Sequence, residues 1–176
     1  EELQPFKVRS ADNRLPTRWM TGTQSHESIA AGMACVDYIA DIGKKTGASE
    51  NASRRDALKA AFSAIVVYEQ TLSQKLIEGL SEIEEIEIYG ITDLARLSER
   101  FPTFSIRHRN ISPAELASRL SQNGIYVWNG NYYALGFSER MGFEPEGMVR
   151  IGLVHYNTSH EIDRLIGVIK QLSVES

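Results

Sequence analysis

Arg150 is the residue of this chain whose setting most directly suggests chemistry. It lies inside the apolar run from Met148 to Val154, which has the composition of a buried β-strand. A guanidinium keeps its charge, so burying it costs several kcal/mol unless a carboxylate or phosphate pairs with it. Two partners are open: an anion that arrives with a ligand, or an Asp or Glu of the chain itself. The residues alone favour neither.

A second candidate is the segment from Trp128 to Tyr133, which combines aromatic rings, amide side chains and a central glycine. Asn129 and Tyr133 could line a ligand pocket, because loops on rigid scaffolds often carry binding groups. The alternative is an ordinary turn whose aromatic rings cover the edge of the core. Taken alone, the motif favours the turn, since short motifs are unspecific.

A third candidate is Gly22 and Thr23, which precede a predicted helix. Threonine hydroxyls and free backbone amides at a helix N-terminus suit a phosphate group. A simple turn and helix cap explains the same residues. The four histidines lack metal-ligand spacing, so no metal site is predicted. Cys35 is flanked by small apolar residues and is expected to be a packed, inert thiol.

The bulk composition excludes several classes of protein. The 176 residues are 42% hydrophobic and 24% charged, with a net charge of −4. These values are ordinary for a globular protein and give no basic surface for nucleic acid. No apolar run approaches the roughly 20 residues of a membrane span. We therefore expect no nucleic-acid or membrane partner, and the single cysteine suggests the cytoplasm.

The elements that would position these candidates can be predicted from periodicity. Residues 1 to 24 lack a pattern and read as a loop with a short strand at 6 to 8. One helix is expected from 25 to 42, ending at Gly43, and a longer one starts near 53. The apolar stripes of the two helices are Ile29, Met33, Val36 and Ile39, and Leu58, Phe62, Ile65, Tyr68, Leu72 and Leu76.

The rest of the chain alternates strands and helices. Strands are predicted at 84 to 89, 103 to 108, 125 to 128 and around Arg150, with a short helix between 92 and 100. Ser112 begins one helix, and Thr158 with Glu161 forms a capping box that begins the last. The predicted class is α+β, a small, mainly antiparallel sheet with helices on one face, preceded by two long helices.

Three motifs, taken in order, resemble the C-terminal part of class V aminotransferase family proteins, near the cysteine desulfurase-like and selenocysteine lyase-like branch. They are Arg18-Trp19-x-x-Gly22-Thr23-Gln24, Gly124 to Tyr133, and Val149 to Asp163. The resemblance covers nearly the whole chain. It implies the C-terminal domain of a fold-type I scaffold, with residues 1 to 24 as a trailing segment of the large domain or a dimer-interface loop and 25 to 176 as the small domain.

The resemblance also implies a cofactor and residue roles. Relatives use pyridoxal phosphate on an amino-acid substrate, as homodimers. Arg150 would hold the substrate carboxylate, and Asn129 and Tyr133 would line the pocket entrance. Thr23, with Gly22 beside it, would reach the cofactor phosphate across the dimer interface.

Two departures limit what the resemblance implies. Relatives carry the cofactor-binding lysine in a Ser-x-His-Lys motif, which none of the six lysines of this chain has. This segment alone is therefore expected to be inactive and to contain no catalytic residue. Tyr133 also lies near the position of the nucleophilic cysteine of one desulfurase group, so persulfide chemistry is not indicated.

Two functions follow from the sequence. The first is the C-terminal portion of a pyridoxal-phosphate-dependent enzyme with lyase, transaminase or epimerase chemistry. The second is a non-catalytic α+β module that binds a small molecule or a protein. The strand and helix order also admits an RNA-binding sheet, which the acidic charge disfavours.

Overall fold

The computed structural model describes residues 3–20 and 22–175. The chain divides into two compact units, Glu1–Phe62 and Ser63–Ser176, and each is described by itself. The division lies inside helix α2 (Arg54–Ser81). The boundary near residue 24 that the resemblance implies stays a prediction.

The first unit contains the short 3-10 helix η1 (Thr17–Trp19), helix α1 (His26–Thr46) and the start of α2. Ser25 caps α1 by accepting a hydrogen bond from the Ser28 amide. The strand predicted at 6 to 8 is wrong, because these residues are irregular.

Gly43 does not end α1, as the sequence suggested, but lies buried inside it. A Cβ at this position would lie 1.8 Å from the Ala57 carbonyl oxygen, so the glycine lets α1 and α2 approach closely. Ala57 and Ala61 are fully buried at the same contact. The helix ends at Gly47, whose φ of +157° few other residues adopt.

The predicted apolar stripe of α1 is exposed in this chain. Ile29 and Met33 keep 56% and 63% of their surface accessible, and Val36 keeps 39%. Cys35 is exposed as well, so the packed thiol expected from the sequence is not observed. The contact with α2 uses small residues at the end of α1 and leaves this stripe uncovered.

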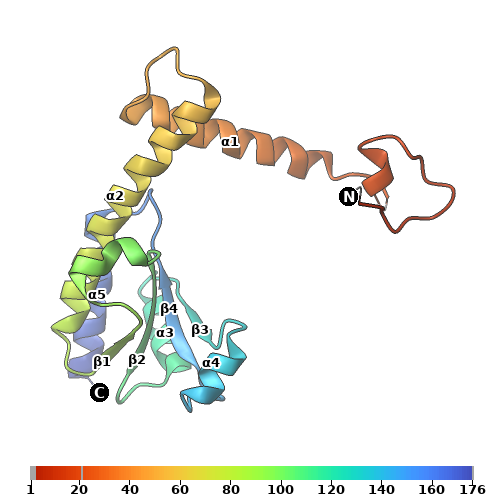
Figure 1. The fold of residues 1–176 in the computed structure, drawn as a ribbon. Helices are drawn as coiled ribbons and strands as arrows, with labels where there is room; N and C mark the ends of the chain where they lie inside the picture. Colours follow the sequence, from red (N-terminus) through yellow and green to blue (C-terminus); the bar gives the residue numbers. More distant parts are fainter. Residues whose placement is uncertain (1–2, 21, 176) are drawn as a thin grey trace. The chain divides into compact units, whose positions relative to one another are not determined.

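The second unit is built on four antiparallel strands, β1 (Ile86–Tyr89), β2 (Thr103–His108), β3 (Trp128–Gly130) and β4 (Met148–Gly152), in the order β1-β2-β4-β3 (Figure 1). This confirms the predicted antiparallel α+β class. β3 begins where the predicted strand was to end. The amide of Ile125 bonds to the Leu120 carbonyl, which ties the approach to β3 to the preceding helix instead.

The other elements of this unit are the 3-10 segment η2 (Leu94–Glu99) and the helices α3 (Pro113–Gln122), α4 (Leu135–Arg140) and α5 (Ser159–Val174). Both predicted helix starts are confirmed. Ser112 caps α3 with Pro113 in its first turn, and Thr158 with Glu161 forms the capping box of α5. Helix α4 was not predicted.

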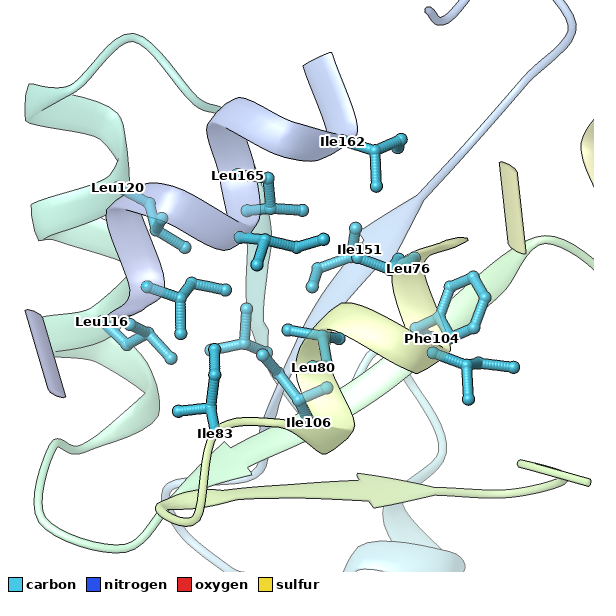
Figure 2. Packing of buried hydrophobic residues seen from close by; sticks show 14 of the residues in the cluster. Leu76, Leu80, Ile83, Phe104, Ile106, Leu116, Leu120, Ile151, Ile162 and Leu165 are labelled. Atoms are coloured by element: carbon cyan, nitrogen blue, oxygen red, sulfur yellow. The ribbon is translucent and has the colours of Figure 1, made fainter. Parts of the chain in front are cut away.

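The core lies between the sheet and the helices α2, α3 and α5 (Figure 2). Strand alternation sends Phe104 and Ile106 of β2, with Val149 and Ile151 of β4, into this core. Leu76 and Leu80 of α2 meet them, and α3 and α5 complete the cluster with Leu116, Leu120, Ile162 and Leu165. Each such side chain contributes roughly 1.5–3 kcal/mol of burial. The core therefore fixes which face of the sheet remains for ligands.

No helix in the described ranges combines the length and the hydropathy that a bilayer crossing requires.

Candidate functional site

Arg150 lies on the face of the sheet opposite the core. Its neighbours Val149 and Ile151 point into the core, so alternation directs Arg150 to the other side, where it is exposed. We call this side of the sheet the open face. The burial cost inferred from the apolar run does not arise, because the run is buried on one face only.

No Asp or Glu of residues 3–20 and 22–175 forms an ion pair with Arg150. The structural ion pair that the sequence left open is therefore absent from the described part of the chain. The Tyr132 ring lies against the guanidinium instead, with 5.4 Å between its centroid and the Arg150 Cζ. This contact leaves the N–H groups at the edge of the guanidinium without a carboxylate.

Neighbouring strands supply the flanks of Arg150. Trp128 of β3 and Ser105 of β2 are its direct cross-strand partners. Since paired residues share a face, an indole and a hydroxyl lie on either side of the guanidinium. An anion placed here would meet a cation between an aromatic wall and a small polar side chain.

The other candidates of this segment lie apart from Arg150. Asn129 pairs with Val149, so the register puts it on the core side of the sheet. Tyr133 is fully exposed, and its amide bonds to Asn131 Oδ1 at 3.1 Å. The structure brings Tyr132, rather than Asn129 or Tyr133, to Arg150.

Tyr132 does not stand out in the sequence, because two tyrosines follow each other in a turn. Both have positive φ, +49° for Tyr132 and +64° for Tyr133. The Tyr132 ring is half-buried beside Arg150, whereas the Tyr133 ring is fully exposed. Spacing does not reveal such a conformation. The available signal was only that an aromatic ring follows two residues after the end of an edge strand.

Burial dominates the electrostatics of Tyr132. It raises the pKa of the phenol to about 12, against the opposing effects of Ser105 and the positive charges of Arg150 and Arg107. The hydroxyl oxygen lies beside Ser105 without reaching hydrogen-bond geometry to any described residue. Tyr132 is therefore a neutral ring at physiological pH.

Arg107 is a second cation on the open face, but it is already occupied. It pairs with Glu146 at 3.0 Å, donates to the Gly147 carbonyl and stacks over the Phe143 ring. His108, the next residue of β2, is buried. The positive charge that remains available on the face belongs to Arg150.

His108 is a structural histidine. Its Nδ1 accepts from the amides of Asn110 and Ile111, and its Nε2 lies 3.0 Å from Ser173 Oγ. Burial lowers the pKa of His108, with Glu85 opposing the shift. The ring therefore ties β2 to α5 in its neutral form.

Gly22 and Thr23 belong to the first unit, where both are exposed in a bend before α1. A Cβ at Gly22 would meet nothing within 4 Å, so packing does not require this glycine. Thr21, a further threonine of the same motif, lies outside the described residues. The hydroxyl that caps α1 is that of Ser25.

The second unit does not supply an amine to the open face. Its two lysines, Lys75 and Lys170, belong to the core-side helices and pair with Asp163 and Glu82. No cluster of His, Cys, Asp or Glu in the described ranges could hold a metal ion. On the open face, the Arg150 guanidinium can bind a carboxylate, but no lysine of the second unit lies there to form an imine.

Comparison with known proteins agrees with the motifs. The profile of the family described as aminotransferase class-V matches residues 56–165. An aminotransferase-like protein FGM3 of Gibberella zeae is 32% identical over 117 residues, which cover 65% of this chain and 29% of that protein. A cysteine desulfurase of Klebsiella pneumoniae is 24% identical over 91% of this chain and 33% of its own length.

Solved structures show the same fold. The apo structure of a cysteine desulfurase from Thermococcus onnurineus NA1 has a TM-score of 0.69 at 24% identity, over 92% of this chain and 34% of that one. The Escherichia coli cysteine desulfurase CsdA has a TM-score of 0.66 at 14% identity, over 91% of this chain and 33% of its own. This chain spans about a third of the length of these relatives. With the family profile matching well over half of its residues, the chain belongs to the class V aminotransferase family.

Proposed function

We propose that this chain is the C-terminal portion of a pyridoxal-phosphate-dependent enzyme that acts on an amino acid by lyase, transaminase or epimerase chemistry. Membership of a family that depends on this cofactor supports the proposal, as do cysteine desulfurase relatives about three times as long. The observation that carries it is Arg150, an exposed arginine without an ion pair in the described chain, flanked by aromatic side chains.

In this function Arg150 holds the α-carboxylate of the substrate. A guanidinium binds a carboxylate through two parallel N–H···O bonds, which fix the orientation of the substrate as well as its position. Arg150 is mounted on a strand between two others, and the capped helix α5 follows it closely. A strand that is paired on both sides fixes the position of the Arg150 guanidinium, while the reacting bonds lie elsewhere on the substrate.

The cofactor requires residues that this unit lacks. Pyridoxal phosphate acts as an electron sink for bonds at the substrate α-carbon. The open face offers no lysine for it, so a segment outside this chain supplies the lysine and most of the cofactor site. Thr23 and Gly22 belong to this proposal as contacts of the cofactor phosphate in a neighbouring subunit, because they are exposed in a bend before a helix.

The assembly proposed with this function is a homodimer in the cytoplasm. The exposed apolar stripe of α1, with Ile29, Met33 and Val36, supports a partner surface. Asn129 and Tyr133 are proposed as residues of the pocket entrance because both are exposed to solvent at the end of β3. Tyr133 lies in the turn beside Tyr132, whereas Asn129 would contribute from the sheet face opposite Arg150.

Substitution of Arg150 tests the proposal in the longest native polypeptide that carries this chain. Arg150→Ala should raise the dissociation constant for an amino-acid substrate by about 10- to 100-fold, the effect of a lost charged hydrogen bond. Cofactor absorbance should not change. Arg109→Ala, which removes an exposed arginine at the end of β2, is the matched control. Unchanged substrate affinity in Arg150→Ala would sink the assignment.

The alternative is a non-catalytic α+β module that binds a small molecule or a protein through the Arg150 surface or its long helices. Adding pyridoxal phosphate to the longest native polypeptide distinguishes the two functions. An imine absorbance band that disappears on reduction with borohydride supports the enzyme, and the absence of any such band supports the module. In the 176-residue chain alone, pyridoxal phosphate should form no imine on the open face. The two lysines of the second unit, Lys75 and Lys170, are ion-paired on the other side of the sheet.

A further inference from the structure

We infer that Tyr132 is a positioning residue: its ring holds the Arg150 guanidinium by one face so that the N–H groups at its edge remain ready for a planar anion. The inference rests on the proposed function, in which that anion is the substrate carboxylate. It adds a residue for which neither the motifs nor the relatives provide a role.

The contact geometry is the first support. The Arg150 Cζ lies 5.4 Å from the Tyr132 ring centroid, within the range of a cation–π contact. Arg150 has no ion pair among the described residues, so this ring is its main restraint apart from the strand. A cation–π contact uses the flat side of the guanidinium, whereas a carboxylate binds its edge. The two interactions can therefore coexist.

The backbone of the turn is the second support. Tyr132 has a φ of +49°, a left-handed conformation that costs a non-glycine residue about 1 kcal/mol or more. Neighbouring contacts hold it. Asn131 donates to Glu144 at 3.2 Å and accepts from the Tyr133 amide, and its carbonyl accepts from the Ala134 amide. The strained turn is thus fixed by its own surroundings.

A close backbone contact anchors the same turn. Gly147 lies so near Gly130 that an added Cβ would come within 2.1 Å of the Gly130 carbonyl carbon. This contact joins the end of β3 to the start of β4, the strand that carries Arg150. The turn with Tyr132 and the strand with Arg150 are therefore held as one rigid pair.

The chemistry of the ring decides which part of Tyr132 acts. The hydroxyl oxygen is buried, beside Ser105, and makes no hydrogen bond of good geometry with a described residue. It cannot reach a ligand on the open face. The aromatic ring, and not the hydroxyl, is the functional group, so Tyr132→Phe should retain the effect and Tyr132→Leu should lose it.

The first measurement needs no ligand. In the 176-residue chain, the Arg150 Nε–H resonance should show a ring-current shift and a high order parameter, and both should persist in Tyr132→Phe and collapse in Tyr132→Leu. Tyr126→Leu removes an exposed tyrosine just before β3 and serves as the matched control. The amide spectrum confirms that each variant is folded. A mobile, unshifted Arg150 in the wild type, or an unaffected one in Tyr132→Leu, overturns the inference.

The second measurement titrates L-alanine, and separately acetate, at constant ionic strength, following the same resonance. Binding to the wild type and Tyr132→Phe should match, and Tyr132→Leu should bind about 3- to 30-fold more weakly, the range of a cation–π contact. Equal binding by Tyr132→Leu, or loss in Tyr132→Phe, refutes the positioning role. Absence of any response at a well-ordered wild-type Arg150 contradicts the carboxylate role of the proposed function and leaves the ligand-free result to judge Tyr132.

Discussion

At the scale of the residue, burial and charge separate the groups that serve the fold from those that can serve a ligand. Arg107, His108 and Arg150 lie on adjacent strands, yet of these three only Arg150 is exposed and has no ion pair with a described residue. Arg107 is matched by Glu146, and His108 is held neutral by burial. Arg150 is therefore the cation on the open face that can bind an anionic ligand.

His108 gives the protein a defined response to acid. Its pKa in the folded state lies below the unfolded value of 6.5, so the unfolded chain binds the proton more tightly. The stabilisation is present above pH 6.5 and is lost as the pH falls through the folded pKa. Urea unfolding between about pH 7.5 and pH 5 should therefore show a decreasing free energy of unfolding, with protonation of His108 contributing.

His108→Asn isolates this contribution, because an amide oxygen can still accept from the amides of Asn110 and Ile111 but does not titrate. Its free energy of unfolding should fall less over the same pH range. His26→Asn, which makes the same substitution at an exposed position of α1, is the matched control. Equal slopes for wild type and His108→Asn would refute the assignment.

At the scale of the element, small residues and caps determine where helices begin, end and meet. Gly43 matters because it has no side chain, whereas Thr158 matters because its side chain satisfies a backbone amide.

Two glycines of α1 should respond oppositely to the same substitution. Gly43→Ala puts a Cβ onto the Ala57 carbonyl and should destabilise the α1–α2 contact by more than 1 kcal/mol, as overpacking does. Gly32→Ala meets nothing within 4 Å and should stabilise the helix by about 0.5–1 kcal/mol. Thermal unfolding followed by circular dichroism measures both. A neutral Gly43→Ala would mean that the two helices do not pack as described.

The capping box of α5 should contribute about 1 kcal/mol. Thr158→Ala removes the acceptor of the Glu161 amide and should lower the free energy of unfolding by that amount in urea titrations. Ser118→Ala, at an exposed position within α3, is the control and should change stability little. If the two variants are equally stable, the cap does not act as proposed.

At the scale of the whole molecule, each of the two units leaves apolar side chains uncovered. Ile29 and Met33 of α1 are exposed in the first unit, and so are Val66 and Val67 of α2 in the second. Surfaces of this kind in soluble proteins mark contacts with other chains or domains. They agree with a chain that spans about a third of its relatives.

The isolated chain should therefore self-associate. Light scattering coupled to size exclusion should give a mass above 19.7 kDa that rises with concentration. Met33→Lys, which places a charge within the stripe of α1, should reduce association, whereas Ser118→Lys at an exposed position of α3 should not. A monomer at every concentration, in wild type and variants alike, would show that the exposed stripe does not drive contacts.

The sequence by itself determined much of the fold, because the relevant signals are local. The caps at Ser112 and Thr158 and the alternation at 103 to 108 involve neighbours along the chain and were found in the structure. Two of the three family motifs, Gly124 to Tyr133 and Val149 to Asp163, lie within residues 56–165, which the class V profile matches. The prediction that α1 ends at Gly43 was wrong, because a glycine that ends a helix cannot be told in sequence from one that lets a second helix pack closely.

Only the tertiary structure decided which face Arg150 occupies and what lies beside it. An apolar run around an arginine is compatible with burial on both faces or on one, and strand pairing with β2 and β3 selects one. The turn conformation then brings Tyr132, instead of Tyr133, to the guanidinium. Contacts between residues 18 positions apart along the chain depend on backbone angles and register, which composition and spacing do not encode.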